Sequence, residues 1–172
     1  DLMFTGIYDD FISSCHYFEL FNPTGVDIDL SNYTIGFDNN FVLGSTPPTS
    51  GFSGLSINLS GIVAAESTFM IRVSFGGPCN SCPTIVPDLS FENNSGINFD
   101  DRLVLFNNVT SVVKDVWQNH TTPGIGFDKG YIFKRKVTAT APTSLFNLAD
   151  WDYNATEDCF GFAISSTVLP NI

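Results

Sequence analysis

Short runs of aromatic and β-branched residues recur along the whole chain, separated by turn formers such as Asn22-Pro23-Thr24-Gly25. No stretch of about twelve residues repeats apolar positions at helical spacing without an intervening Gly, Pro or Asn. Many short strands with Gly- and Pro-rich connections are typical of a sandwich or a barrel, so we predict an all-β fold. About eight or nine strands are expected, at Leu2–Tyr8, Tyr17–Phe21, Tyr33–Phe37, Leu55–Leu59, Thr68–Ser74, Arg102–Phe106, Ser111–Trp117, Tyr131–Lys136 and Phe160–Ser165.

The connections between these strands differ in length. Leu103–Phe106 and Val112–Val116 flank the short connection Asn107–Thr110, which predicts a β-hairpin. Gly76–Gly96 and His120–Lys129 are expected to be long loops, either binding loops or structural Ω-type loops.

Length and composition favour one domain over residues 1–172. A chain of 172 residues with 43% hydrophobic residues is long enough to bury its own core. No apolar run approaches the roughly 20 residues of a membrane-spanning helix. The chain starts at Asp1 without a signal-like segment, as expected for a mature secreted protein or a trimmed one.

The charge is strongly acidic, with 18 acidic against 7 basic residues and a formal net charge of −11. A nucleic-acid-binding surface needs a basic footprint, and the one basic cluster, Lys134–Lys136, lies on an expected strand. We therefore expect no nucleic acid partner and no membrane insertion. The acidity suits either a well-solvated extracellular surface or a calcium-dependent one.

The four cysteines are Cys15, Cys79, Cys82 and Cys159. Cys79 and Cys82 lie in a Gly- and Pro-bounded loop, which favours a local disulfide and leaves Cys15 to pair with Cys159. A zinc site and a redox-active CxxC are the alternatives. Zinc normally requires a second close ligand pair, and no βαβ pattern surrounds the CxxC.

Asparagine sequons are a second sign of a secreted, extracellular protein. Six Asn-x-Ser/Thr motifs predict N-linked glycans, at Asn32, Asn58, Asn93, Asn108, Asn119 and Asn154.

Four segments follow one another in the order of a known family's pattern. The first, Tyr17–Phe37, carries Glu19, Asn22, Pro23, Thr24, Asp29, Leu30, Ser31 and Tyr33. The later ones are Val63–Val73, Phe99–Phe106, and Gly130–Lys136 with Asn147–Trp151. In this order they resemble the lamin tail domain family, in its bacterial, secreted form. Glu66 stands where that family usually has Gly.

The resemblance implies an immunoglobulin-like β-sandwich of the lamin-tail type, and it carries over no catalytic residue. The residues themselves support the same picture. Asp29 and Ser31 are expected to cap free backbone N–H groups, and Leu30 and Tyr33 to anchor the loop to the core. Trp151 is expected to close one mouth of the sandwich.

A search for catalytic chemistry yields no enzyme. Ser53 lacks a complete nucleophile elbow, and Cys15 and His16 are adjacent on a strand, so their side chains face opposite ways. His120 lies inside a sequon. We expect no cofactor.

Calcium is the one metal that the carboxylate pairs suggest, although no known calcium loop is present and solvated turn aspartates are the default interpretation. The pairs are Asp9 with Asp10, Asp27 with Asp29, Asp100 with Asp101, and Asp150 with Asp152.

The leading functional hypothesis is a non-enzymatic extracellular structural module, a glycosylated surface or filament subunit. It is expected to assemble with other copies of itself through sheet edges or terminal strands, with Asp1–Tyr8 and Ser166–Ile172 as docking candidates. The alternative is a carbohydrate-binding or accessory module that uses Trp117, Tyr131 and Trp151, although all three are typical core residues.

Overall fold

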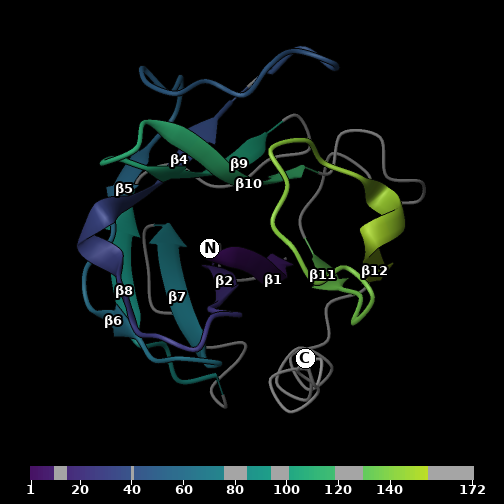
Figure 1. The fold of residues 1–172 in the computed structure, drawn as a ribbon. Coiled ribbons are helices and arrows are strands. Elements are labelled where there is room, and N and C mark those ends of the chain that lie inside the picture. The colour runs from purple at the N-terminus through teal and green to yellow at the C-terminus, as the bar shows by residue number, and fades with distance from the viewer. Residues whose placement is uncertain (10–14, 40, 76–84, 94–100, 119–129, 155–172) are drawn as a thin grey trace.

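A computed structural model describes residues 1–9, 15–39, 41–75, 85–93, 101–118 and 130–154, where two main β-sheets pack face to face (Figure 1) and a third sheet has two strands. Twelve strands are present in this part of the chain: β1 (Met3–Asp9), β2 (Cys15–Phe21), β3 (Ile28–Asp29), β4 (Tyr33–Asp38), β5 (Ser56–Asn58), β6 (Ile62–Val63), β7 (Thr68–Phe75), β8 (Leu89–Asn93), β9 (Arg102–Asn107), β10 (Val112–Gln118), β11 (Tyr131–Arg135) and β12 (Trp151–Asn154). Its helical elements are two short 3-10 turns, η1 (Leu30–Asn32) and η2 (Leu148–Asp150). The all-β sandwich predicted from the sequence is confirmed.

The larger sheet has six strands in the order β12-β11-β1-β2-β7-β8. All neighbours are antiparallel except β7 and β8, which run parallel. The N-terminal strand β1 thus lies in the middle of the chain's own sheet, hydrogen-bonded to β11 on one side and β2 on the other.

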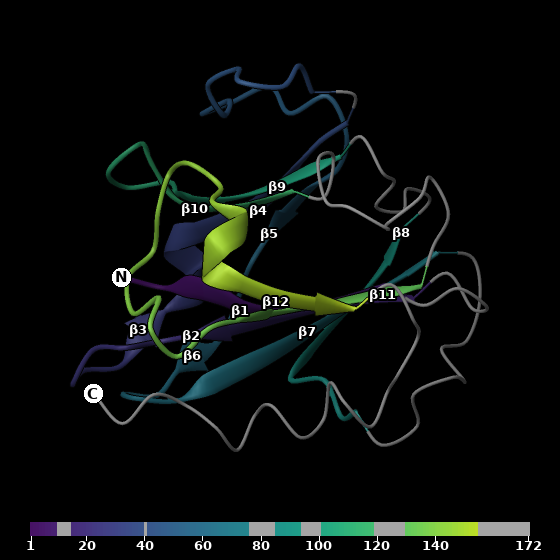
Figure 2. The ribbon, with the colours of Figure 1, turned by 90° about the vertical axis from the view of Figure 1, so that its right-hand side faces the viewer.

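The smaller sheet has four antiparallel strands in the order β10-β9-β4-β5. It lies above the six-stranded sheet in Figure 2. The predicted hairpin is confirmed as β9 and β10. Asn107 Oδ1 accepts the backbone N–H groups of Val109 and Thr110, at 3.0 and 2.8 Å, and thereby closes the turn.

The core lies between the sheets, where alternate residues of each strand point inward. Phe18 and Leu20 of β2 face Leu103 and Leu105 of β9 in the same cluster. Leu30 and Tyr33 are also buried there, as expected. Asp29 Oδ1 accepts the Ser31 N–H at 2.9 Å, which confirms the cap expected from Asp29, while the cap expected from Ser31 stays a prediction.

Part of the outward side of the six-stranded sheet is apolar as well. Ile132, Tyr8 and Tyr17 form a row across three neighbouring strands and belong to a second buried cluster with Cys15 and Ile85. Strand β2 is therefore buried on both faces, which explains its nearly continuous apolar sequence.

Four strands were not predicted from the sequence. The expected long loop Gly76–Gly96 contains β8, and β3, β6 and β12 were not expected. Two of these have two residues each, too few for a period-2 pattern, and β12 follows a 3-10 turn directly. The predicted strand Phe160–Ser165 and the loop His120–Lys129 lie outside the described residues.

No helix in the described ranges is long and apolar enough to cross a membrane.

Candidate functional site

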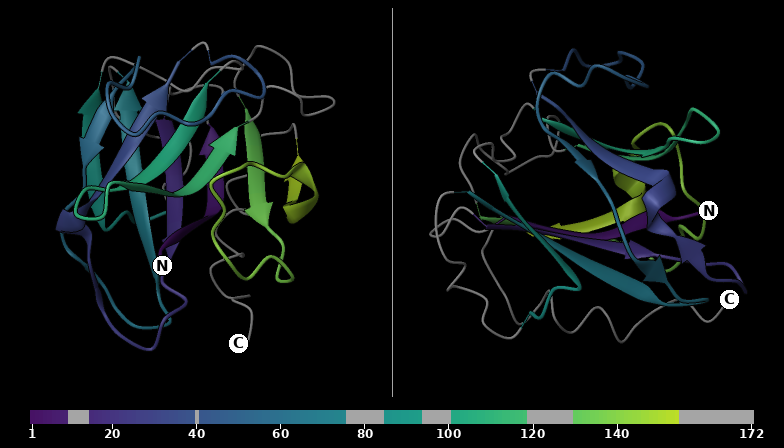
Figure 3. Two further views of the ribbon diagram at one scale, coloured as in Figure 1. Left: turned by 45° about the horizontal axis from the view of Figure 1, so that its top comes forward. Right: turned by 90° about the vertical axis from the view of Figure 1, so that its left-hand side faces the viewer.

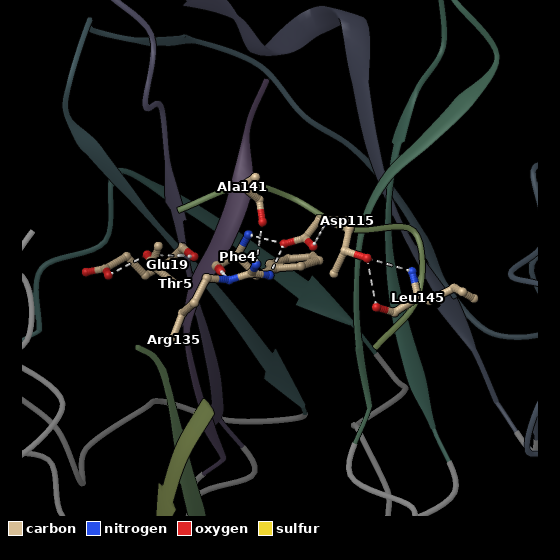
Figure 4. A network of polar contacts seen from close by, with 8 residues as sticks. Phe4, Thr5, Glu19, Asp115, Arg135, Ala141 and Leu145 are labelled. Carbon is tan, nitrogen blue, oxygen red and sulfur yellow. Dashed lines mark hydrogen bonds and ion pairs between the residues drawn. The ribbon is translucent and has the colours of Figure 1, made fainter. Parts of the chain in front are cut away.

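A buried ion pair joins the two sheets. Arg135, at the end of β11, and Asp115, on β10, approach to 2.5 Å, with side chains 2% and 0% exposed. Asp115 also accepts the N–H groups of Phe4 at 2.8 Å and Thr143 at 2.9 Å. Arg135 donates to the carbonyl oxygens of Phe4 at 2.7 Å and Ala141 at 3.0 Å, as Figure 4 shows. These contacts join strand β1 of the larger sheet to β10 of the smaller sheet, and both to the connection of residues 136–147.

Burial and hydrogen bonding act in opposite directions on the Asp115 carboxyl group of this pair. Burial raises the pKa of Asp115, while Arg135 and the N–H groups of Thr143 and Phe4 act in the opposite direction. The Arg135 guanidinium also lies 4.9 Å from the centre of the Trp151 ring. Trp151 is buried, as expected for a residue that closes one mouth of the sandwich.

A second polar pair lies in the interior between the sheets. His16 Nδ1 is 2.5 Å from Asp9 Oδ1, and both side chains are fully buried. Asp9 Oδ2 accepts the Gly130 N–H at 3.2 Å. The pKa of neighbouring Tyr131 is raised well above its ordinary value by burial and by the charges of Asp9 and Asp101. Both side chains of this dyad are thus shielded from solvent within the core.

The Cys15–His16 pair behaves as the strand geometry predicts. Cys15 belongs to the outward cluster of the six-stranded sheet, and His16 pairs inward with Asp9. Cys15 is disulfide-bonded. It is the one cysteine among the described residues, so the pairing with Cys159, and that of Cys79 with Cys82, stay predictions.

The carboxylate pairs are dispersed or already engaged. Asp27 accepts the Ala65 N–H at 3.0 Å, and Asp29 is bound to Ser31. Asp152 lies 3.8 Å from Lys136 at the surface, whereas Asp101 is buried. Within the described ranges, no three His, Cys, Asp or Glu side chains gather closely enough to hold a metal ion. Asp10 and Asp100 lie outside those ranges.

The sequons lie mostly at strand ends. Asn58, Asn93 and Asn154 are the last residues of β5, β8 and β12. Asn32 ends the η1 turn, and Asn108 follows directly on β9. Asn119 lies outside the described residues.

Three of these sequons meet at one end of the four-stranded sheet. The Thr34 hydroxyl lies 2.9 Å from Asn58 Oδ1 and 3.1 Å from Asn108 Oδ1. The Asn108 N–H donates to the Asn32 carbonyl at 2.8 Å. Asn58 and Asn108 are exposed, so their amide groups are accessible on the outer side of this sheet.

The three aromatic residues considered for carbohydrate binding are all in the core. Trp117, Tyr131 and Trp151 are 0%, 1% and 3% exposed. The Trp117 and Tyr131 rings stack 5.7 Å apart between the sheets. They offer no flat surface to a sugar ring.

An open groove of about 410 Å³ lies on the outer side of β9 and β10. Leu43 and Pro47 line one part of it, and Leu145 and Phe146 another. Its polar lining residues are Arg102, Gln118, Ser45 and Ser144. In Figure 3 the segment around residues 41–55 crosses the four-stranded sheet on this side. The groove could not be predicted from the sequence because it forms from segments that are distant along the chain. Leu43 and Leu145, apolar residues in loops, were the available signal, and both are exposed.

Arg102 binds the segment at Ser45 and Thr46, which forms one side of the groove. Its guanidinium pairs with Asp38 at 2.5 Å and donates to the carbonyl oxygens of Ser45 and Thr46 at 2.8 and 3.3 Å. It also lies 4.8 Å from the centre of the Phe41 ring. Because these partners satisfy the cation, the groove offers a ligand mainly apolar contacts.

Comparisons with protein-family models and with curated proteins find no match for this chain. The resemblance to lamin tail domains therefore rests on the motifs alone.

Proposed function

We propose that the chain is a non-enzymatic, extracellular structural module of the lamin-tail type, a glycosylated surface or filament subunit. It assembles with copies of itself through the edges of its sheets or through terminal strands.

The observation that carries this proposal is the open architecture of the two sheets. Within the described part of the chain, β12 and β8 flank the larger sheet, and β10 and β5 flank the smaller one, each paired on one side only. An edge strand presents unpaired N–H and C=O groups to which another chain can add a strand. Head-to-tail contacts of this kind produce filaments when they do not close into a ring.

The burial of the two polar pairs supports a structural role. The titratable groups that most resemble catalytic ones form the pairs Asp115–Arg135 and Asp9–His16, and all four side chains are buried. Of the two terminal docking candidates, Asp1–Tyr8 lies within the chain's own sheet. The sheet edges and Ser166–Ile172, which lies outside the described residues, remain as the candidates for contacts between copies.

The test is electron microscopy of the native protein, with sedimentation velocity and intact mass measured on the same sample. Ordered fibres, or a concentration-dependent rise in sedimentation coefficient, are expected. A single species with the mass of one glycosylated chain at all concentrations would overturn the proposal.

The groove favours a second candidate, a carbohydrate-binding module. Phe146 supplies an aromatic ring and Gln118 a polar side chain in a concave site, a combination common in small-ligand sites. A glycan array would identify a ligand, and Leu145→Asp should abolish its binding because Leu145 is exposed at the rim. Val137→Asp is the control, since Val137 is also exposed but does not line the groove.

A further inference from the structure

We propose that the predicted N-linked glycans guard the sheet edges, because a sequon lies at the end of every edge strand in the two main sheets of the described structure. Asn58 ends β5, Asn93 ends β8 and Asn154 ends β12. Asn119 follows directly on Gln118, the last residue of β10. This inference rests on the extracellular, glycosylated character of the proposed function and narrows its mode of assembly.

The interior strands show a different pattern. Six described strands lie in the interior of the two main sheets: β11, β1, β2, β7, β9 and β4. Among these six, only β9 is followed directly by a sequon, at Asn108. Asn32 precedes β4 instead of ending a strand. Four of the six sequons thus lie at or directly after the end of an edge strand. The other two, at Asn32 and Asn108, serve as controls for glycans that are not on an edge strand.

The physical reason is the geometry of strand addition. An incoming strand must approach an edge strand to about 4.8 Å along the hydrogen-bonding direction. An N-linked glycan is a bulky, hydrated group, and at the end of an edge strand it occupies the space that such a strand must enter. The other edge protections are partial here: β5 and β12 are short, and β10 carries an irregular register between Val113 and Asp115.

The contacts of Asn58 show how one guard is oriented. Its Oδ1 atom accepts the Thr34 hydroxyl at 2.9 Å. The sugar is attached at the other branch of the amide, Nδ2, which this hydrogen bond leaves unused. Asn58 is exposed on the outer face of the sheet, opposite Thr34 of the neighbouring strand β4, so a glycan at Nδ2 extends into solvent from that face of the edge strand β5.

The edge guards restrict where copies can join. An edge whose sequon carries a glycan resists strand addition, so assembly of the native subunit is confined to edges whose sequons are unoccupied or to a terminal segment. Loss of the sugars opens a second, edge-to-edge route.

The experiment compares two sets of sequon variants made in a host that adds N-glycans. The edge set is Asn58→Gln, Asn93→Gln, Asn119→Gln and Asn154→Gln together, and the matched control is Asn32→Gln with Asn108→Gln. Peptide mapping by mass spectrometry first gives the occupancy of each site in the parent. Sedimentation velocity then measures association, after circular dichroism has shown that both sets fold.

The edge set is expected to form species of dimer mass or larger at concentrations where the control matches the parent. Asn154→Lys in place of Asn154→Gln should reduce that association, because a lysine at an edge also opposes strand pairing. Enzymatic trimming of the sugars from the folded parent should reproduce the effect, and it serves as the decisive measurement if the edge set fails to fold.

Unoccupied edge sites in the parent would overturn the inference, and so would an edge set or trimmed parent that associates no more than the control. A monomeric glycosylated parent whose edge set associates would refute the proposed self-assembly while upholding the edge guards.

Discussion

Arg135→Met tests whether the buried pair with Asp115 holds the sandwich together. Met retains much of the apolar length that packs beside Trp151 but removes the charge and all the donors. Asp115, whose side chain is 0% exposed, is left buried without its counter-charge. The carbonyl groups of Phe4 and Ala141 lose their donor as well. Removing one partner of a buried pair typically costs about 3–5 kcal/mol.

That cost is large for a domain of this size. Net stabilities are about 5–15 kcal/mol. With a midpoint shift of about 2–4 °C per kcal/mol for chains of 150–250 residues, the variant should melt roughly 6–20 °C below the parent. The deficit should also depend on pH. Burial already raises the pKa of Asp115 above 3.8, and loss of Arg135 raises it further.

The sign of the pH effect follows from proton linkage. A carboxyl group with a raised pKa holds its proton more tightly when folded, so stability falls as the pH rises through the interval above 3.8. The deficit of Arg135→Met should therefore shrink in acid. Urea unfolding at several pH values measures it, with Lys136→Met as the neighbouring control, because Lys136 is 38% exposed and 3.8 Å from Asp152. The control should cost about 0–1 kcal/mol. An Arg135→Met deficit no larger than the control's would refute the reasoning.

Three further substitutions probe other parts of the structure. Burial raises the pKa of Glu19 above 4.5, so Glu19→Gln should raise the urea midpoint at neutral pH, and this gain should vanish below pH 4.5. Gly36→Ala places a Cβ 2.3 Å from an aromatic ring and should cost about 1–3 kcal/mol in urea unfolding. Gly25→Ala is its control, since nothing lies within 4 Å of its Cβ. Cys15→Ser should lower the unfolding free energy by about 2–5 kcal/mol, and a non-reducing peptide map of the parent should show which cysteine pairs with Cys15.

Local patterns predict the regular part of this fold well. The strands β4 and β9 begin where the sequence places them, at Tyr33 and Arg102, because each run is apolar, β-prone and preceded by turn formers. The 3-10 turn before β4 was also readable, since Asp29 caps Ser31 within two residues. Glu66 stands where the lamin-tail pattern usually has Gly, and its φ of 54° lies in the left-handed region that favours glycine.

Features that depend on long-range pairing were not predictable in the same way. Asp115 and Arg135 are 20 residues apart and Phe4 is 111 residues from Asp115, so no local spacing links them. The groove beside Arg102 was likewise not predictable, because its lining residues are distant along the chain. The sequons were visible as motifs, but which strands form the sheet edges appears only once the strand order is known.

Charge sets a final condition on self-assembly. The chain carries a net charge of −11, with 7 basic residues in all. Four of these already pair within the chain: Arg102, Lys114, Arg135 and Lys136. Few cations are therefore available to form ion pairs with a neighbouring copy, and the net interaction between copies is repulsive. Because the screening length falls from about 30 Å at 0.01 M salt to about 8 Å at 0.15 M, association should strengthen with ionic strength. Sedimentation of the native protein across this range measures the effect, and association that weakens as salt is added would mean that ion pairs form the contact.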